Sequence, residues 1–174
     1  MQRAWQAAQS VVVLDAATVR LLNRAVRQRP PIMRLCRVTA QRLAVVQVVL
    51  LVALGVSGRR AAALRTLAGV AAIYALVELI GGRWDRARPF VVLADVAPLL
   101  GHESRRSFPS RHVASAVAMA SVAAGEWPAL AGAMRLVAAL LALSRVGAGL
   151  HYPSDVVAGA LLGAAVGRAL RRSR

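Results

Sequence analysis

The stretch AAALRTLAGVAAIYALVELI, residues 61–80, is the longest of five apolar runs in this chain of 174 residues. A helix rises about 1.5 Å per residue, so about 20 residues cross the hydrocarbon layer of a bilayer. The other runs are shorter and need flanking residues to reach that length; they lie at residues 43–56, 113–124, 129–143 and 156–170. Hydrophobic residues make up 58% of the chain, well above the usual share of a soluble protein. The sequence therefore predicts an all-α protein, a polytopic membrane helix bundle with about five transmembrane helices.

The N-terminal segment, residues 1–42, is less apolar than these runs. Charged residues such as Asp15 and Arg20 interrupt it, and Pro30-Pro31 end any helix that precedes them. This pattern is typical of an amphipathic interfacial helix or a re-entrant helix. We therefore expect one such helix before residue 30, and a single membrane domain over residues 1–174.

The net charge of the chain is +16, and all 23 of its basic residues are arginines. A chain as basic as this is usually a nucleic-acid-binding protein. Here, however, the arginines lie between the apolar runs and do not gather on one polar face, so we expect no nucleic acid as a partner. Membrane lipids and an anionic substrate explain the charge better.

Three short stretches carry residue types that suit chemistry on a phosphate ester. They read Arg86-Ala87-Arg88-Pro89, Pro109-Ser110-Arg111-His112, and Ser144-Arg145 followed by His151 and Asp155. One histidine could act as the nucleophile and another could protonate the leaving group, while arginine and serine hold anionic oxygens. Each stretch alone could equally be a polar helix end with a structural role. Together, in this order and spacing, they favour catalysis.

The three stretches resemble the signature of the type 2 phosphatidic acid phosphatase family, which also includes vanadium haloperoxidases. The third stretch matches at every signature position, including the spacings from Arg145 to His151 and from His151 to Asp155. The likeness runs from about residue 80 to residue 159, nearly half of the chain. Within the family the chain looks most like the bacterial undecaprenyl-diphosphate phosphatases, because it is small and its first helix is weakly hydrophobic.

The resemblance implies a role for each residue of the site. His151 would attack phosphorus and form a phosphohistidine, and Asp155 would accept a hydrogen bond from its other ring nitrogen. His112 would give a proton to the leaving oxygen. The substrate phosphate would be bound beside the N-terminus of a helix that starts near Ser110. The implied phosphate-binding groups are Arg88, Ser110, Arg145 and the backbone amide of Arg111.

Two positions depart from the family pattern. The family usually has a lysine seven positions before the arginine of its first motif, and this chain has Gly81 there. Arg83 and Arg86 are the nearest substitutes, and we expect Arg83, because the preceding glycines would let its side chain turn inward. Arg111 stands where the family most often has glycine, and its side chain could hold a second phosphate. This second departure favours a diphosphate substrate.

These residues predict an integral membrane lipid phosphatase, and a polyprenyl diphosphate of the undecaprenyl type ranks first as its substrate. Phosphatidic acid, phosphatidylglycerol phosphate or another prenyl-linked phosphate stays open as an alternative. A non-catalytic protein that binds lipid phosphate would fit the departure at Gly81. A haloperoxidase is the least expected reading, because the haloperoxidases of this family are soluble.

Counting the hairpins places residues 83–111, the expected active-site loop, and residues 144–155 on one side of the membrane. The Arg59-Arg60 turn and the arginine-rich stretch from Arg168 onward fall on the other side. The positive-inside rule makes that second side cytoplasmic. The site is therefore expected at the extracytoplasmic face of a bacterial inner membrane.

Neither a metal nor another cofactor is expected. The chain has only 3 histidines, and none has the compact spacing of metal ligands. Arginines would take the role that metals have in other phosphatases. His102 and Glu103 lie outside the signature and are read as loop residues, and Asp85 is expected to pair with the neighbouring Arg86.

In the last run, Gly159, Gly163 and Gly167 recur every fourth residue. Small residues at this spacing lie on one face of a helix and let a second helix approach closely. We therefore expect a packing role for these glycines and no role in ligand binding.

Overall fold

The computed structural model describes residues 2–172 as helices joined by short turns and one long connection. Within that range there is no strand, and the all-α prediction is confirmed. The helices are α1 (Gln2–Arg27), α2 (Pro30–Val56), α3 (Arg60–Trp84), α4 (Pro89–Val92), α5 (Arg111–Ala123), α6 (Pro128–Gly147) and α7 (Pro153–Arg172).

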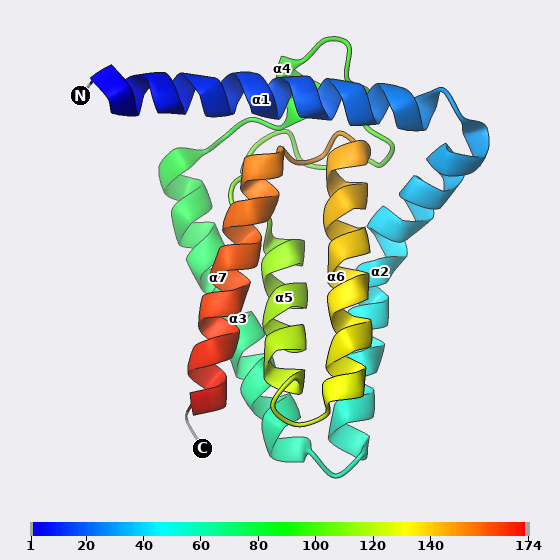
Figure 1. The fold of residues 1–174 in the computed structure, drawn as a ribbon, viewed down its shortest axis with the longest axis vertical. Helices are drawn as coiled ribbons and strands as arrows, with labels where there is room; N and C mark the ends of the chain where they lie inside the picture. Colours follow the sequence, from blue (N-terminus) through cyan, green and yellow to red (C-terminus); the bar gives the residue numbers. More distant parts are fainter. Residues whose placement is uncertain (1, 173–174) are drawn as a thin grey trace.

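The helices α2, α3, α5, α6 and α7 lie side by side as a bundle, and α1 crosses one end of it (Figure 1). The long connection between α3 and α5, which contains α4, lies at the end that α1 covers. The α2–α3 turn, the α5–α6 turn and the end of α7 lie at the opposite end (Figure 1). The relative sidedness predicted from the hairpin count agrees with this arrangement.

The helix α2 begins earlier than its apolar run suggested. It starts at Pro30 and not near residue 43, so the predicted interfacial segment 1–42 is too long. Proline is well tolerated in the first turn of a helix, where its missing N–H has no intrahelical partner. The interfacial helix is α1 alone, and it ends at Arg27, before the two prolines as predicted.

The helix α3 ends later than expected. It continues through Gly81 and Gly82 to Trp84, and the chain then turns where Asp85 adopts a left-handed conformation with φ 35°. Two adjacent glycines therefore do not end this helix, because the neighbouring turns hold its backbone. The polar connection starts at Asp85.

Three of the described segments are long and apolar enough to cross a membrane: α2, α6 and Arg60–Val92, which includes α3 and α4. By contrast, α5 has only 13 residues, and α7 carries Asp155 in its first turn. Within the bundle α5 packs against α3, α6 and α7. The number of bundle helices matches the prediction of about five spans. The short helix α5 is surrounded by the apolar side chains of the neighbouring helices.

The close packing of α7 on α5 depends on the glycine stripe of α7. A Cβ atom placed on Gly163 would lie 2.1 Å from the carbonyl oxygen of Ala114, and one on Gly159 would lie 2.5 Å from that of Ser110. Only glycine allows so close an approach of two backbones. The predicted packing role of these glycines is confirmed, and the contact fixes the start of α5 beside the first turns of α7.

Gly163→Ala is expected to lower the thermal unfolding midpoint of the purified protein in detergent. The added methyl group collides with the backbone of α5, and overpacking of this kind costs about 1–3 kcal/mol. Gly132→Ala is the matched control, because a Cβ atom there meets nothing within 4 Å. Equal midpoints for the two variants would contradict this packing.

Candidate active site

The three sequence stretches meet at the end of the bundle that α1 covers. They surround a pocket of about 30 Å³. That volume is about the size of one water molecule. All three histidines of the chain line this pocket. The lining residues used below are Glu78, Arg88, His102, Glu103, Arg106, Arg111, His112 and His151.

Four different elements position the predicted site residues. Arg88 immediately precedes α4, and Ser110 is the N-cap of α5. Arg145 lies in the last turn of α6, and Asp155 lies in the first turn of α7. His151 lies in the short connection between these two helices. The packing of the bundle therefore fixes the relative places of all five residues.

His151 is buried, with 3% of its surface exposed. Its Nδ1 lies 2.9 Å from the carbonyl oxygen of Ser107, and its Nε2 lies 3.2 Å from Nη1 of Arg88. A carbonyl oxygen only accepts and a guanidinium only donates, so the proton is on Nδ1 and the lone pair is on Nε2. Nε2 is therefore the nitrogen that can attack phosphorus.

The charge state of His151 suits this role. Burial and the cations of Arg145 and Arg88 lower the pKa of His151 to about 4, against the opposing effect of Asp155. The imidazole is therefore neutral at pH 7, and its nucleophilic lone pair is available.

Asp155 is fully buried and organises the corner behind His151. Its Oδ2 accepts a hydrogen bond from the backbone N–H of Tyr152 at 2.8 Å, and its Oδ1 accepts one from Arg86 at 2.7 Å. Oδ2 lies 3.7 Å from Nδ1 of His151. The short hydrogen bond that fixes the tautomer of the ring therefore goes to Ser107, and Asp155 faces the ring as a nearby negative charge.

His112 and Arg145 form a second pair in the site. Nη2 of Arg145 lies 2.8 Å from Nδ1 of His112. Because arginine can only donate, Nδ1 accepts, and in the neutral ring the proton is on Nε2. Nε2 is therefore the nitrogen of His112 that can pass a proton to a leaving oxygen, once a bound anion stabilises the imidazolium form of the ring.

His102 also belongs to the site, although the sequence predicts only a loop residue at this position. Its Nε2 lies 3.3 Å from Nη2 of Arg145, and its ring centroid lies 6.4 Å from that of His151. Burial and the neighbouring cations of Arg88 and Arg145 lower the pKa of His102 to about 3. The only sequence signal for it is the scarcity of histidine in this chain.

Four buried polar atoms of the site have no hydrogen-bond partner among the described residues. They are Nε of Arg88, Nε of Arg145, Nδ1 of His102 and Oγ of Ser110. Ser110 stands at the N-cap of α5, yet its hydroxyl does not cap the helix. Buried polar atoms are normally paired, so a cluster of unpaired ones marks the place of a ligand. All four atoms can donate, so the ligand is an acceptor, as a phosphate group is.

Two further arginines lie at the rim of the pocket, where they share one carboxylate. Nη1 of Arg106 lies 2.8 Å from Glu78, and Nη1 of Arg111 lies 3.5 Å from it. Arg106 also packs against Gly81, because a Cβ atom on Gly81 would lie 3.6 Å from the Cβ atom of Arg106. Arg106 therefore occupies the side of the pocket that a longer residue at position 81 would fill.

The structure does not bring Arg83 to this pocket. Arg83 is exposed in the last turn of α3 and is not one of the lining residues. Because α3 continues through the two glycines, they do not form the turn that would direct Arg83 inward. Arg106, which approaches from the long connection, is the cation that lies against Gly81.

Asp85 and Arg86 do not form the ion pair that their adjacency suggested. Asp85 pairs with Arg105, whereas Arg86 binds Asp155 at 2.7 Å and Asp15 at 2.8 Å. The left-handed turn at Asp85 sends the two side chains in different directions. Arg86 therefore supports Asp155 and does not line the pocket.

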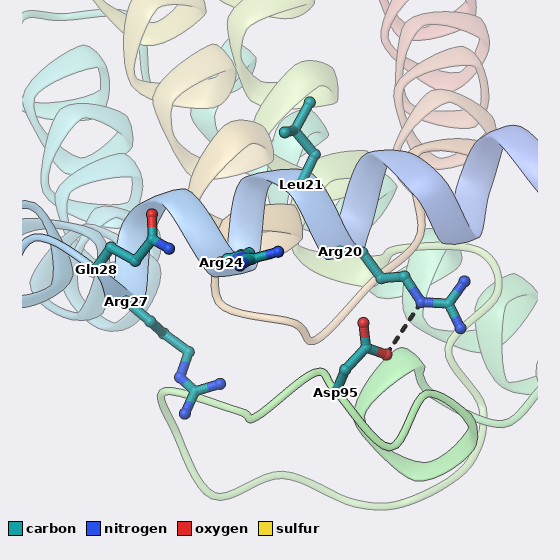
Figure 2. A pocket seen from close by; sticks show the side chains of 6 residues that line it. All are labelled: Arg20, Leu21, Arg24, Arg27, Gln28 and Asp95. Carbon is teal, nitrogen blue, oxygen red and sulfur yellow. Dashed lines mark hydrogen bonds and ion pairs between the residues drawn. The ribbon is translucent and has the colours of Figure 1, made fainter.

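Two larger hollows lie near the site. One of about 550 Å³ shares His102 and His112 with the pocket and extends to Arg37 of α2. The other, of about 600 Å³, lies between α1 and the long connection, where Arg20 is paired with Asp95 (Figure 2). No signature residue lines this second hollow, so the small pocket is the candidate active site.

Metal ligands were also sought. In the part of the chain that the structure describes, no group of three or more His, Cys, Asp or Glu side chains could hold a metal ion. Catalysis without a metal stays a prediction, and the roles considered below use only protein side chains.

Comparison with known proteins places this site in a family. A family model described as "PAP2 superfamily" matches residues 62–174, which is more than half of the chain. The chain belongs to the PAP2 superfamily. The PAP2 match begins within α3 and contains every predicted site residue, whereas α1 and α2 lie outside it.

Two curated proteins resemble the PAP2 region of this chain. The bacitracin transport permease protein BcrC of Bacillus licheniformis is 33% identical over 88 residues, which are 51% of this chain and 43% of that protein. The lipid A 1-phosphatase of Rhizobium johnstonii is 41% identical over 93 residues, which are 51% of this chain and 38% of that protein. The matched region thus spans less than half the length of either relative.

Two crystal structures share the fold over nearly the whole chain. LpxE of Aquifex aeolicus has a TM-score of 0.77 and 29% identity, and the match covers 91% of this chain and 95% of that one. A PAP2 type phosphatidylglycerolphosphate phosphatase from Bacillus subtilis has a TM-score of 0.68 and 22% identity, with coverages of 99% and 96%. The arrangement of α1 and α2 on the PAP2 region therefore has counterparts of known structure.

Histidine-selective NMR of the labelled protein tests the charge states in this PAP2 site. We expect the signal of His151 to titrate with a pKa of about 4 and that of His102 with a pKa of about 3, because burial and arginine cations disfavour both imidazolium forms. Both rings then stay neutral from pH 7 down to about pH 5, and His151 shows the proton on Nδ1. Single histidine-to-glutamine variants assign the signals. Titration of either ring near its ordinary value of 6.5 would contradict the geometry.

Proposed function

We propose that this chain is an integral membrane lipid phosphatase that hydrolyses a polyprenyl diphosphate of the undecaprenyl type. The observation that carries the proposal is the cluster of unpaired donors beside Nε2 of His151, the ring nitrogen that carries the lone pair. Together these groups form a binding place for a tetrahedral anion with a nucleophile next to it. Membership of the PAP2 superfamily supports the same chemistry.

In the first step, Nε2 of His151 attacks the terminal phosphorus in line. The new P–N bond forms as the P–O bond to the leaving oxygen breaks. His112, which takes up a proton together with the substrate phosphate, gives its Nε2 proton to that oxygen and returns to the neutral imidazole. Arg88 and Arg145 hold the non-bridging oxygens, where negative charge increases, and Ser110 adds a neutral donor. The Asp155 carboxylate stabilises the positive charge that develops on the ring of His151.

In the second step, water attacks the phosphohistidine. The neutral imidazole of His112 takes a proton from that water and becomes the imidazolium, the P–N bond breaks, and inorganic phosphate leaves with His151 neutral again. The hollow toward Arg37 adjoins His102 and His112. It offers a polar route for the water and for the phosphate product.

The rim arginines support a diphosphate as substrate. Glu78 forms ion pairs with both Arg106 and Arg111 at the mouth of the pocket, as a second phosphate group would. The transferred phosphate would then lie at His151, and the phosphate that remains on the lipid would replace Glu78 between the two guanidinium groups. The lipid tail would lie along α3, whose Leu79 is 73% exposed.

A lipid with a single phosphate is the second candidate substrate. The 41% identity to a lipid A 1-phosphatase and the shared fold of a phosphatidylglycerolphosphate phosphatase favour it. For either substrate we place the site at the extracytoplasmic face of the membrane, because the opposite end of the bundle carries the Arg59-Arg60 turn and, near the end of α7, Arg168 and Arg171.

A substrate panel tests the proposed function. We expect the purified chain in detergent to release phosphate from polyprenyl diphosphate with a higher kcat/KM than from polyprenyl monophosphate, phosphatidic acid, phosphatidylglycerol phosphate or lipid A. His151→Ala should abolish release, and His112→Ala should lower kcat about 10²–10⁴-fold. Faster turnover of one of the monophosphates would overturn the diphosphate assignment alone. No turnover of any lipid phosphate would overturn the enzyme assignment.

The rim is tested by a matched pair of arginine variants. Arg106→Ala should lower kcat/KM for the diphosphate about 10–100-fold, because a charge-assisted hydrogen bond contributes about 1.5–3 kcal/mol. Arg83→Ala should leave kcat/KM unchanged, since Arg83 is exposed outside the pocket. If Arg83→Ala lowers kcat/KM and Arg106→Ala does not, Arg83 is the residue that substitutes for the missing lysine.

A further inference from the structure

A buried carboxylate reaches the back of the site from outside the matched PAP2 region. Asp15 lies in the middle of α1, a helix that the family match does not include. Only 3% of its surface is exposed. A carboxylate is rarely buried in this way unless it is fully paired, so its partners identify its function.

The hydrogen bonds of Asp15 go to Ser154, the neighbour of Asp155 in the chain, and to Arg86, which binds Asp155. Its Oδ1 accepts the backbone N–H of Ser154 at 2.9 Å, and its Oδ2 accepts the Ser154 hydroxyl. Oδ2 also accepts Nη2 of Arg86 at 2.8 Å, while Nη1 of the same guanidinium donates to Asp155 at 2.7 Å. Arg86 is thus held between two carboxylates, and one of them faces His151.

The charges of this cluster add up to a net negative charge behind the nucleophile. Asp15 and Asp155 contribute two negative charges and Arg86 contributes one positive charge, which leaves −1. His151 becomes positive when it attacks phosphorus, so a negative charge on the side away from the substrate stabilises the transition state. Without Asp15, Arg86 would neutralise Asp155 completely.

We propose that Asp15 is a positioning residue of the catalytic site, which makes α1 a functional part of the enzyme. Asp15 holds the start of α7 in place through Ser154 and takes up part of the Arg86 charge, so that Asp155 keeps an effective negative charge toward His151. This inference rests on the proposed phosphatase function. It adds to that function a residue that does not touch the substrate.

Two other residues of α1, Asn23 and Arg20, also hold this helix against the end of the bundle. The side-chain amide of Asn23 donates to the carbonyl oxygens of Ala97 and Gly147, both at 3.0 Å. At the exposed edge of α1, Arg20 pairs with Asp95 at 3.0 Å (Figure 2). Because these contacts also fasten α1 to the loops, Asp15 is not needed for attachment alone. Asp95 provides a matched aspartate control.

The groups around His151 set the background for a charge test. They come from every element that packs against the ring and include cations, a carboxylate and two further imidazoles. They are Arg88 and His102 of the long connection, His112 of α5, Arg145 of α6 and Asp155 of α7. Asp15→Asn and Arg86→Gln change none of these groups. Both variants change the charge behind Asp155, and both also alter hydrogen bonds to Ser154.

The test is a double-mutant cycle read by the NMR titration of His151. Asp15→Asn brings the charge of the cluster to zero and should lower the pKa of His151 by about one unit. Arg86→Gln brings the charge of the cluster to −2 and should raise the pKa of His151 by about as much. The double variant restores −1, and its titration should return toward that of the wild-type protein. Loss of packing alone cannot produce shifts of opposite sign that cancel.

Kinetics and stability complete the experiment. Asp15→Asn should lower kcat about 10–100-fold with KM unchanged, because the residue acts through Asp155 and not on the substrate. Asp95→Asn should change neither value. The thermal midpoint of each variant in detergent is measured as a folding control.

The outcomes separate this inference from the proposed function. If the wild-type protein turns over and Asp15→Asn has unchanged kcat and an unchanged His151 titration, the inference is overturned. It is also overturned if both single variants shift the titration in the same direction, since that result indicates a structural role only. If the wild-type protein hydrolyses no lipid phosphate, the proposed function fails, and the titration cycle still decides whether Asp15 sets the charge behind His151.

Discussion

Two guanidinium groups buried without a carboxylate partner impose the main constraint on this fold. Arg88 and Arg145 are 4% and 3% exposed, and in the described chain their hydrogen bonds go to backbone carbonyls and to histidine nitrogens. Removing such a charge from water costs several kcal/mol when no counter-charge compensates it. The helix ends and the long connection must therefore supply acceptors such as the carbonyl oxygen of Leu150. The remaining excess of positive charge is compensated when an anion binds.

The residues that are close in sequence were predictable, because their geometry depends on short connections. Arg145, His151 and Asp155 lie on the end of α6, the tight connection and the start of α7, so their spacing alone brings them together. The apolar runs likewise predicted the bundle helices, and the small-residue spacing predicted the contact of α7 with α5. The sequence predicted the helix boundaries less well. Pro30 begins α2 where an interfacial segment was expected, and Gly81 and Gly82 lie within α3 where the helix was expected to end.

The residues that the sequence did not reveal are those held by long-range contacts. Arg106 takes the place beside Gly81 because the long connection folds back over the end of α3, and no local pattern encodes that path. His102 reaches Arg145 from the same connection, 43 positions away. Asp15 is 139 positions from Ser154. In the sequence, Asp15 reads as an interruption of an apolar stretch, and only the fold turns it into a buried partner of Arg86.

The short length of α5 leaves room for a charged pocket within a bundle whose longer helices are apolar enough to cross a membrane. At about 1.5 Å per residue, the 13 residues of α5 give a helix well short of the 20-residue α6, and its start lies below the end of α6 and the start of α7 (Figure 1). The first turn of α5, with Ser110 and His112, is therefore recessed into the bundle. The glycine contacts with α7 keep it at that depth, while α1 and the long connection cover it from the polar side. In the proposed phosphatase, a phosphate group that enters past Glu78 of α3 would approach along the exposed apolar side chains Leu76 and Leu79, and this route favours a substrate that carries a lipid tail.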